Sequence, residues 1–442
     1  MKPTYDELIK LVAQQQQTIV RLEKRVAELE ERLNLNSNNS SKPPSTDQKK
    51  NRRAPQGGAK KGHPGHYRKL FAENKISKRI LSSLNACSHC GSTEIKKKPS
   101  HILHQIDVPD IQATVTQIEC EKGFCKKCGK NLRAPFPKDY AKRSFGPKLI
   151  TLIGILSSVY RLSKRSTQQL LKMLFNVDIS LGSLPNQEKN LSKGLEKAYQ
   201  QLKEQVDKHP VAYVDETTFR QQAKTHYMWT ATTNQAVVVK VLPSRGLESL
   251  KQIRPRSHSG VTVTDRYQVY SYKKHQYCLA HIQRDFKKFA EKKSGDQELA
   301  NRALFELNEI FLACRLHCRK TMQQRVYYRK KRFKEILQDI FANGSEIFSR
   351  FAERMLKHVP KLFLFTKYPD VECTNNAAER SLRHLVLWRK TSYGTQSDEG
   401  SRFIERAVSI WMTLKKQGKS VVPFFLQAYQ ATYHPHILSP SI

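Results

Sequence analysis

Two copies of a Cys-x2-Cys-Gly motif place the strongest limit on how this chain folds. The first motif contains Cys87 and Cys90, and the second contains Cys125 and Cys128. Two thiolates at this spacing can reach one tetrahedral Zn²⁺, and the glycine accommodates the tight turn after the second thiolate. The four cysteines therefore predict a zinc ribbon over residues 81–140 that holds Zn²⁺.

The segments between the two motifs, 101–108 and 113–120, have the composition of strands. Cys120 ends the second segment and is interpreted as a strand residue rather than a ligand. A ribbon of this size has little hydrophobic core, so the metal is expected to supply much of its folding free energy. The alternative for the four cysteines is that they are ordinary buried thiols.

The N-terminal region, residues 1–36, carries a heptad repeat. Apolar residues recur at alternating spacings of four and three from Tyr5 to Leu33, and Gln15 is the one polar residue in the series. β-Branched residues at one heptad position and Leu at the other favour a parallel dimer. We predict a coiled-coil helix that joins two chains. The alternative is an amphipathic helix that packs on its own domain.

Residues 37–80 change character abruptly. They are rich in Asn, Ser, Pro, Gly and basic residues, which predicts a disordered linker. Its basic run can neutralise phosphates without folding first, and the alternative is a linker that only increases solubility. The linker residues predicted to contact DNA are Lys49, Lys50, Arg52, Arg53, Lys60 and Lys61.

The charge balance indicates a polyanionic partner. The 442 residues include 78 Lys and Arg but 39 Asp and Glu, a formal net charge of +39. Such a field attracts nucleic acid or an anionic membrane surface. No apolar run reaches the ~18 residues of a spanning helix, and the N-terminus lacks the apolar core of a signal peptide. Double-stranded DNA is therefore the predicted partner, in a cytoplasmic, nucleoid-associated protein of the bacterial type without a membrane contact.

Residues 141–207 have the periodicity of helices. A helix that starts after Ser163 is followed by a Gly-containing turn and a long polar helix. This order is typical of a helix-turn-helix, which predicts a helical DNA-binding module. The alternative is a helical hairpin inside a hydrophobic core.

Two aspartates end apolar strands farther along the chain. Asp215 ends the strand that starts at 211, Asp265 ends the strand that starts at 260, and two more strands between them complete an antiparallel meander. Such carboxylates are ligands for Mg²⁺ or Mn²⁺. The alternative is that each is a turn residue. Glu216 points to the face opposite Asp215, so its replacement is expected to be tolerated.

A third acid, Glu379, falls in the first turns of a helix that begins near Thr374, which Thr374 or Asn375 can cap. The simplest interpretation of Glu379 is an i,i+4 ion pair with Arg383. Its strongly basic neighbourhood instead indicates a carboxylate that works beside phosphates.

The chain resembles the insertion sequence 66 transposase family over nearly its whole length. The segments NSNNSSKPPSTD, VDET, TDRYQVY, CLAHIQRDF, TNNAAERSLR and GTQSDEG, together with the paired cysteine motifs, occur in the order of that family. The resemblance implies a DDE triad of Asp215, Asp265 and Glu379 that holds two Mg²⁺ (or Mn²⁺) ions.

The predicted fold class is multidomain α+β, with the coiled coil, the zinc ribbon and the helix-turn-helix-like module placed before the catalytic part. The resemblance implies an RNase H-like α/β catalytic domain over 208–430. An all-α insertion occupies 286–370, and residues 431–442 form a tail.

The implied activity is that of a DNA transposase. It binds the ends of its insertion element, cleaves phosphodiester bonds with two divalent metals, and transfers the 3′-OH ends to target DNA. A homodimer or a larger synaptic assembly is implied, with accessory proteins of the same element as possible partners. Arg245, Arg383, Arg389 and Lys390 are predicted to contact phosphates. Asn375, Asn376 and Arg380 are predicted to orient DNA or Glu379.

Cys278 and His281 match a C-x2-H motif that many DDE transposases carry after the second Asp. With two ligands and no further pair nearby in the sequence, a structural or DNA-stacking role is favoured over a zinc site. Two alternatives to the transposase remain: a zinc-ribbon DNA-binding protein derived from a transposase but without catalysis, and a metal-dependent nuclease.

Overall fold

A computed structural model describes residues 5–36, 70–96, 102–109, 111–138, 140, 142–292, 295–434 and 436–442. The chain divides into two units, one of which contains the described residues between 70 and 113 and the other the rest. Each unit is described by itself. The linker residues predicted to contact DNA lie outside the described residues: Lys49, Lys50, Arg52, Arg53, Lys60 and Lys61.

Helix α1 (Tyr5–Asn34) is the helix that the heptad predicts. Its apolar heptad side chains are open to solvent in the single chain: Val12 is 60% exposed, Ile19 47% and Leu22 54%. The apolar stripe is therefore available to a second helix, and dimerisation stays a prediction. No helix in the described residues is both long and apolar enough to cross a membrane.

The predicted strands between the two cysteine motifs are wrong. The described parts of 101–108 and 113–120 contain no strand. Their apolar side chains, such as Leu103 and Val115, are exposed and lack an apolar layer to pack against, which a stable strand pair needs. A short hairpin forms instead around the second motif, where β1 (Lys122–Phe124) pairs antiparallel with β2 (Asn131–Arg133). The unit that contains the described residues between 70 and 113 has a 3₁₀ turn, η2 (Glu73–Lys75).

The larger unit, which includes residues 114–442, contains a five-stranded mixed sheet in the order β5-β4-β3-β6-β7. The strands β3, β4 and β5 form the predicted antiparallel meander, and β6 and β7 add parallel to β3. The short helix α5 (Leu247–Lys251) follows β5. The strand bounds are β3 (Val211–Gln221), β4 (Lys224–Thr232), β5 (Val237–Leu242), β6 (Val261–Thr264) and β7 (His275–Tyr277).

One face of the sheet shares a hydrophobic core with helices from both ends of this unit. Buried Leu195 of α4, Trp229 of β4 and Phe425 of α12 belong to this core. The core therefore crosses the predicted boundary at residue 207. Of the two helices predicted to form the helix-turn-helix, α4 belongs to this core, whereas Leu171 of α3 lies in a smaller core with Ile153 of α2 and Leu184 of α4. The helices are α2 (Pro147–Ser158), α3 (Lys164–Phe175), α4 (Ser183–Lys208), α10 (Asn376–Ser392), α11 (Asp398–Lys416) and α12 (Val421–Gln430).

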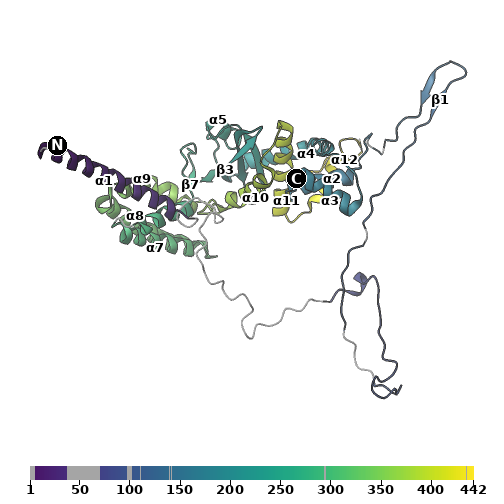
Figure 1. Cartoon of the computed structure of the whole chain (residues 1–442), viewed down its shortest axis with the longest axis horizontal. Coiled ribbons are helices and arrows are strands. Elements are labelled where there is room, and N and C mark those ends of the chain that lie inside the picture. Colours follow the sequence, from purple (N-terminus) through teal and green to yellow (C-terminus); the bar gives the residue numbers. More distant parts are fainter. Residues whose placement is uncertain are drawn as a thin grey trace. The chain divides into compact units, whose positions relative to one another are not determined.

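The other face is covered by the helical segment 279–366, and the described residues of the predicted insertion, 286–370, contain no strand. Its core contains stacked and edge-on rings; Phe289 and Phe348, for example, have centroids 4.2 Å apart. The elements are α6 (Leu279–Glu291), α7 (Gln297–Ala313), α8 (Arg319–Asn343), α9 (Glu346–Leu362) and the 3₁₀ turn η3 (Leu364–Thr366). The result is a mixed α+β fold with helices on both faces of the sheet (Figure 1).

Strand β3 separates the two cores by the alternation of its side chains. Tyr213 belongs to the core of α6–α9, whereas Val214 belongs to the core of α4 and α11. Asp215 therefore shares the face of Tyr213, and Glu216 shares the face of Val214. The opposite orientation of these two neighbouring acids, expected from the sequence, follows from this alternation.

Candidate active site

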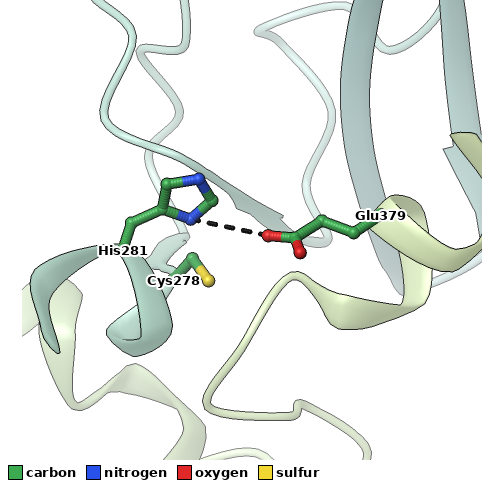
Figure 2. Close-up of side chains that lie close together, drawn as sticks. All are labelled: Cys278, His281 and Glu379. Atoms are coloured by element: carbon green, nitrogen blue, oxygen red, sulfur yellow. Dashed lines mark ion pairs between the residues drawn. The ribbon is translucent and has the colours of Figure 1, made fainter. Parts of the chain in front are cut away.

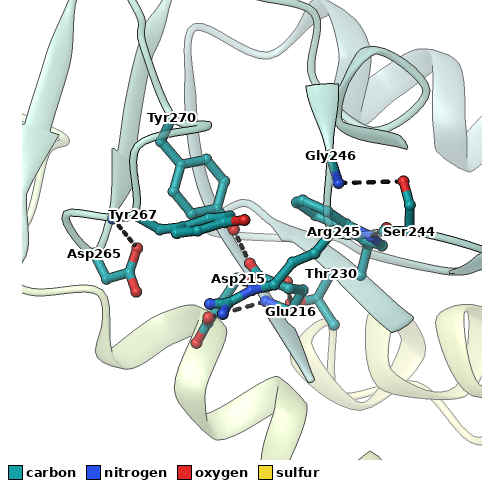
Figure 3. A network of polar contacts seen from close by, with 10 residues as sticks. Asp215, Glu216, Thr230, Ser244, Arg245, Gly246, Asp265, Tyr267 and Tyr270 are labelled. Carbon is teal, nitrogen blue, oxygen red and sulfur yellow. Dashed lines mark hydrogen bonds and ion pairs between the residues drawn. The ribbon is translucent and has the colours of Figure 1, made fainter. Parts of the chain in front are cut away.

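Asp265 follows the last residue of β6, Thr264, as predicted. The prediction that Asp215 ends its strand is wrong, because β3 continues to Gln221 in its antiparallel pairing with β4. Tyr213 of β3 pairs with Val263 of β6, and each aspartate stands two residues farther along its chain. Adjacent strands lie about 4.8 Å apart, so the register places these two acids side by side. In sheets with parallel strands, ligands bind outside the carboxyl ends of the strands. Both acids lie just beyond the last parallel pair of β3 and β6, where β6 ends, although β3 itself continues (Figure 3).

The surroundings of Asp215 disfavour its charged form. Burial, followed by the negative charges of Glu216, Asp265 and Glu379, raises the pKa of Asp215 well above its usual range. Its Oδ1 accepts one hydrogen bond, from the backbone N–H of Glu216 at 2.9 Å. Several carboxylates thus lie close together in a chain of net charge +39. Carboxylate oxygens are the donor set that suits Mg²⁺ or Mn²⁺, so these residues fit such an ion.

Glu216 anchors a network behind the two aspartates. Its side chain is 1% exposed and accepts hydrogen bonds from Arg245 Nε and from the Tyr270 hydroxyl. The Arg245 guanidinium lies 4.1 Å from the centre of the Tyr267 ring, and Tyr267 N–H donates to Asp265 Oδ1 at 2.9 Å. The network therefore connects β3 to the loop that carries Asp265 (Figure 3). The structure does not support the expectation that Glu216 is dispensable.

Hydrogen bonds from Asn375 fix the start of α10. Its Nδ2 donates to Val214 O at 3.0 Å, and its backbone N–H donates to Cys278 Sγ at 3.1 Å. The Asn375 side chain is fully buried and makes no capping bond. The buried Asn375 side chain is closed to DNA, which favours the other expected role, orientation of Glu379. This residue ties the helix that carries Glu379 to the strand that carries Asp215.

Glu379 lies in the first turn of α10 and pairs with α6. Its Oε1 is 3.2 Å from Arg284 Nη2 and 3.7 Å from His281 Nδ1, so the i,i+4 pair with Arg383 is replaced by a long-range one. Across the described part of the chain, the one group of three possible metal ligands within 4.8 Å of one another is Cys278, His281 and Glu379 (Figure 2). The charges of Asp265 and Glu379 both act on Asp215, but neither aspartate belongs to such a group.

The sequence pattern described as "Transposase IS66 family" matches residues 142–402, more than half of the chain. This chain belongs to the IS66 transposase family. A second pattern, a family of unknown function (DUF6444), matches residues 2–69. An uncharacterized protein, y4hP, of Sinorhizobium fredii (strain NBRC 101917 / NGR234) is 23% identical over 370 residues, which are 73% of this chain and 66% of that protein. The chain thus spans about two thirds of the length of this relative.

Membership of the IS66 transposase family implies DNA binding, and the structure adds basic residues that the sequence analysis missed. A groove beside Asp265 is lined from two helices, by Arg284 and Lys288 of α6 and by Arg354 and Lys361 of α9. Arg284 and Lys288 stand four residues apart, which places them on one helix face. That spacing is the signal that could have identified them, had the fold of the insertion been known.

The predicted DNA contacts on α10 of this IS66-family chain differ in exposure. Arg380, Arg383 and Lys390 are exposed, and Asn376 is half-buried. Arg389 is also half-buried, and its Nη1 donates to the carbonyl and hydroxyl oxygens of Thr218. The exposed residues are free to meet a phosphate backbone, whereas Arg389 also ties α10 to β3. Arg245, held by Glu216, keeps 42% of its side chain exposed.

The first cysteine motif forms a closed turn. Cys87 N–H donates to Ser92 O at 2.8 Å, Gly91 N–H donates to Cys87 O at 2.9 Å, and Gly91 has a φ of +73° that glycine adopts without strain. The backbone N–H groups of His89 and Cys90 lower the pKa of Cys87. This turn stabilises a thiolate, the form in which cysteine binds metal.

The second cysteine motif repeats this geometry in its own unit. Cys125 N–H donates to Lys130 O at 2.9 Å, Gly129 N–H donates to Cys125 O at 2.9 Å, and Gly129 has a φ of +68°. Hydrogen bonds from Cys128 and from the Lys127 backbone lower the pKa of Cys125. Both motifs therefore fit Zn²⁺ chemistry.

Purified chain is expected to contain about one structural zinc ion on Cys87, Cys90, Cys125 and Cys128, because four thiolates complete one tetrahedral site. Metal analysis of wild type and of a Cys87→Ser/Cys125→Ser double variant measures this. The variant should lose one equivalent, and a Cys120→Ser control should lose none. Unchanged zinc content in the double variant would contradict the assignment.

Proposed function

We propose that this chain is the catalytic transposase of its element: it binds the element ends, cleaves phosphodiester bonds with divalent metal ions, and transfers the 3′-OH ends to target DNA. The observation that carries the proposal is the register of β3 and β6, which sets Asp215 beside Asp265. The pinning of α10 to β3 through Asn375 adds Glu379 to the same region.

The residues divide the work by their chemistry. Asp215 and Asp265 would hold Mg²⁺ or Mn²⁺, with Glu379 as the third carboxylate. When bound, such ions supply activation of the attacking water or 3′-hydroxyl and stabilisation of the leaving oxygen. The exposed Arg380, Arg383 and Lys390 of α10 would position the DNA backbone.

An RNase H-like catalytic domain is supported by the sheet. Its first three strands form an antiparallel meander, and its two acids follow the last parallel pair of β3 and β6 within a sheet covered by helices on both faces. The all-α segment formed by α7, α8 and α9 separates β6 from α10 in the chain. It contributes part of the basic groove beside Asp265.

A cleavage assay tests the proposal. The substrate is a plasmid that carries the inverted repeats flanking the gene, incubated with full-length protein and Mg²⁺ or Mn²⁺. We expect breaks at the repeat ends that expose 3′-OH groups and that disappear when the metal is chelated. Binding to the repeats without any break under either metal would contradict catalysis.

Dimerisation through α1 is a further prediction, because its apolar heptad stripe is exposed in the single chain. Sedimentation in the absence of DNA should give full-length protein twice the mass of one chain, and protein that starts at residue 37 the mass of one chain. Equal oligomeric states for the two proteins would contradict the coiled coil.

A further inference from the structure

Three donors of different chemistry meet between α6 and α10, next to the two aspartates. Cys278 precedes α6, His281 lies one turn later on the same face, and Glu379 reaches them from α10 (Figure 2). Their ligand atoms lie within 4.8 Å of one another. His281 Nδ1 is buried and makes no hydrogen bond to any described residue, although it lies 3.7 Å from Glu379 Oε1.

We propose that Cys278, His281 and Glu379 form a binding site for a thiophilic divalent cation of the zinc class. A sulfur, a nitrogen and an oxygen ligand suit Zn²⁺ or Co²⁺, whereas Mg²⁺ takes oxygen ligands. The structure corrects the premise that only two ligands are present, because the third comes from a helix about one hundred residues later in the chain. This separation is why the sequence motif alone did not indicate the site.

The three ligand atoms must move slightly closer together to bind one ion. Bonds of about 2.0–2.3 Å in a tetrahedron place donor atoms roughly 3.3–3.8 Å apart. The Glu379 side chain is 34% exposed and the His281 side chain 22%, so side-chain rotation can supply the remaining closure. The fourth position is left for water or a phosphate oxygen, as in zinc sites with three protein ligands.

Neighbouring groups already orient the three donors. The backbone N–H of Asn375 donates to Cys278 Sγ at 3.1 Å. Arg284 Nη2 contacts Glu379 Oε1 at 3.2 Å and keeps this carboxylate beside His281. Such supporting contacts fix the direction of metal ligands in proteins.

The site shares Glu379 with the catalytic acids, a consequence that rests on the proposed function. An ion bound to Cys278 and His281 would retain Glu379, and Asp215 and Asp265 would lose their third carboxylate. Because such coupling is reciprocal, occupation of either site weakens the other.

Cobalt titration tests the site in full-length, zinc-depleted protein. Wild type should bind one more equivalent of Co²⁺ than Cys278→Ser, with tetrahedral d–d bands and a sulfur-to-cobalt charge-transfer band in the difference spectrum. Serine still accepts the Asn375 N–H, and the cysteine motifs contribute equally to every protein. Cys373→Ser, which removes a buried cysteine outside the cluster, is the matched control and should keep the wild-type stoichiometry.

Glu379→Gln provides a second test and should weaken binding of this cobalt by at least about tenfold. Equal stoichiometry in wild type and Cys278→Ser, or unchanged affinity in Glu379→Gln, would overturn the site.

Manganese binding, followed by the resonance of free Mn²⁺, tests the sharing of Glu379. Zn²⁺ should lower the Mn²⁺ affinity of wild type by about tenfold or more and leave that of Cys278→Ser unchanged. Unchanged Mn²⁺ affinity in wild type, together with a positive cobalt result, would overturn the sharing but not the site. No Mn²⁺ binding at all would overturn the proposed function, while the cobalt titration still decides the site.

Discussion

Replacement of Asp215 or Asp265 with asparagine is expected to abolish DNA cleavage and strand transfer while binding to the element ends stays nearly intact. Metal ions contribute several kcal/mol to such reactions, and a loss of ~4 kcal/mol corresponds to about a thousandfold in rate. Affinity comes instead from Lys and Arg residues, so removal of a negative charge should not weaken binding. Cleavage rates and gel-shift affinities of the purified variants measure the two effects separately.

The matched control is Glu372→Ala. Glu372 is an exposed acid close in sequence to Glu379, and its backbone N–H rather than its side chain donates to the Tyr213 hydroxyl. This variant should retain most of the activity. Full activity in both aspartate variants, or an equal loss in Glu372→Ala, would contradict the assigned roles.

Glu216→Ala is expected to destabilise the fold by about 2–3 kcal/mol. The substitution leaves Arg245 and the buried hydroxyl of Tyr270 without their shared acceptor. Removal of one partner of a buried pair costs about 3–5 kcal/mol, and the 42% exposure of Arg245 reduces that cost. Urea unfolding followed by tryptophan fluorescence measures the change, and Glu216→Gln, which still accepts from Tyr270, should lose less.

The comparison for Glu216 is Glu353→Ala. Glu353 pairs with Lys357 on the surface of α9, where both side chains are open to solvent. Exposed pairs of this kind contribute little to stability, so this variant should unfold at nearly the same urea concentration as wild type. Equal losses for Glu216→Ala and Glu353→Ala would mean that the network behind the aspartates adds nothing to stability.

The strands that carry the acids were predictable because their signals are local. The apolar run from Val211 to Val214 and the run from Val261 to Val263 fill both faces of a covered sheet, which distinguishes them from helix and loop. The pattern correctly places Asp265 after the end of β6, but it does not reveal that β3 continues past Asp215 to Gln221, because that extension depends on pairing with β4.

The partners of Glu379 were not predictable in the same way. The sequence offers Arg383 one turn away, but the structure supplies Arg284 and His281 from a helix far back in the chain. The burial of Asn375 was not predictable for a related reason: a polar residue before a helix is expected to cap it or to face solvent, yet here it makes no cap bond and is buried against β3. Both features depend on contacts that a local pattern does not contain.

The strands predicted between the cysteine motifs do not form, because an alternating pattern of apolar residues does not by itself provide a neighbouring strand to pair with. Leu103 is 81% exposed and Val115 90% exposed, so neither segment has an apolar layer to pack against. The hairpin of β1 and β2 needs only the turn of the second motif, and it forms locally. The short hairpin closes a small loop, which costs less conformational entropy than pairing the two longer segments.

The central claim, that Asp215, Asp265 and Glu379 carry out strand transfer, is tested most directly by a joining assay with a pre-cleaved element end. A labelled DNA end with a free 3′-OH is incubated with full-length protein, Mg²⁺ and an unlabelled plasmid, and the label is followed into the plasmid. We predict that wild type joins the labelled 3′-OH to plasmid DNA and that Asp215→Asn does not. Plasmid nicking without label transfer would identify a nuclease, and DNA binding without either reaction would identify a regulator; either result would contradict the account.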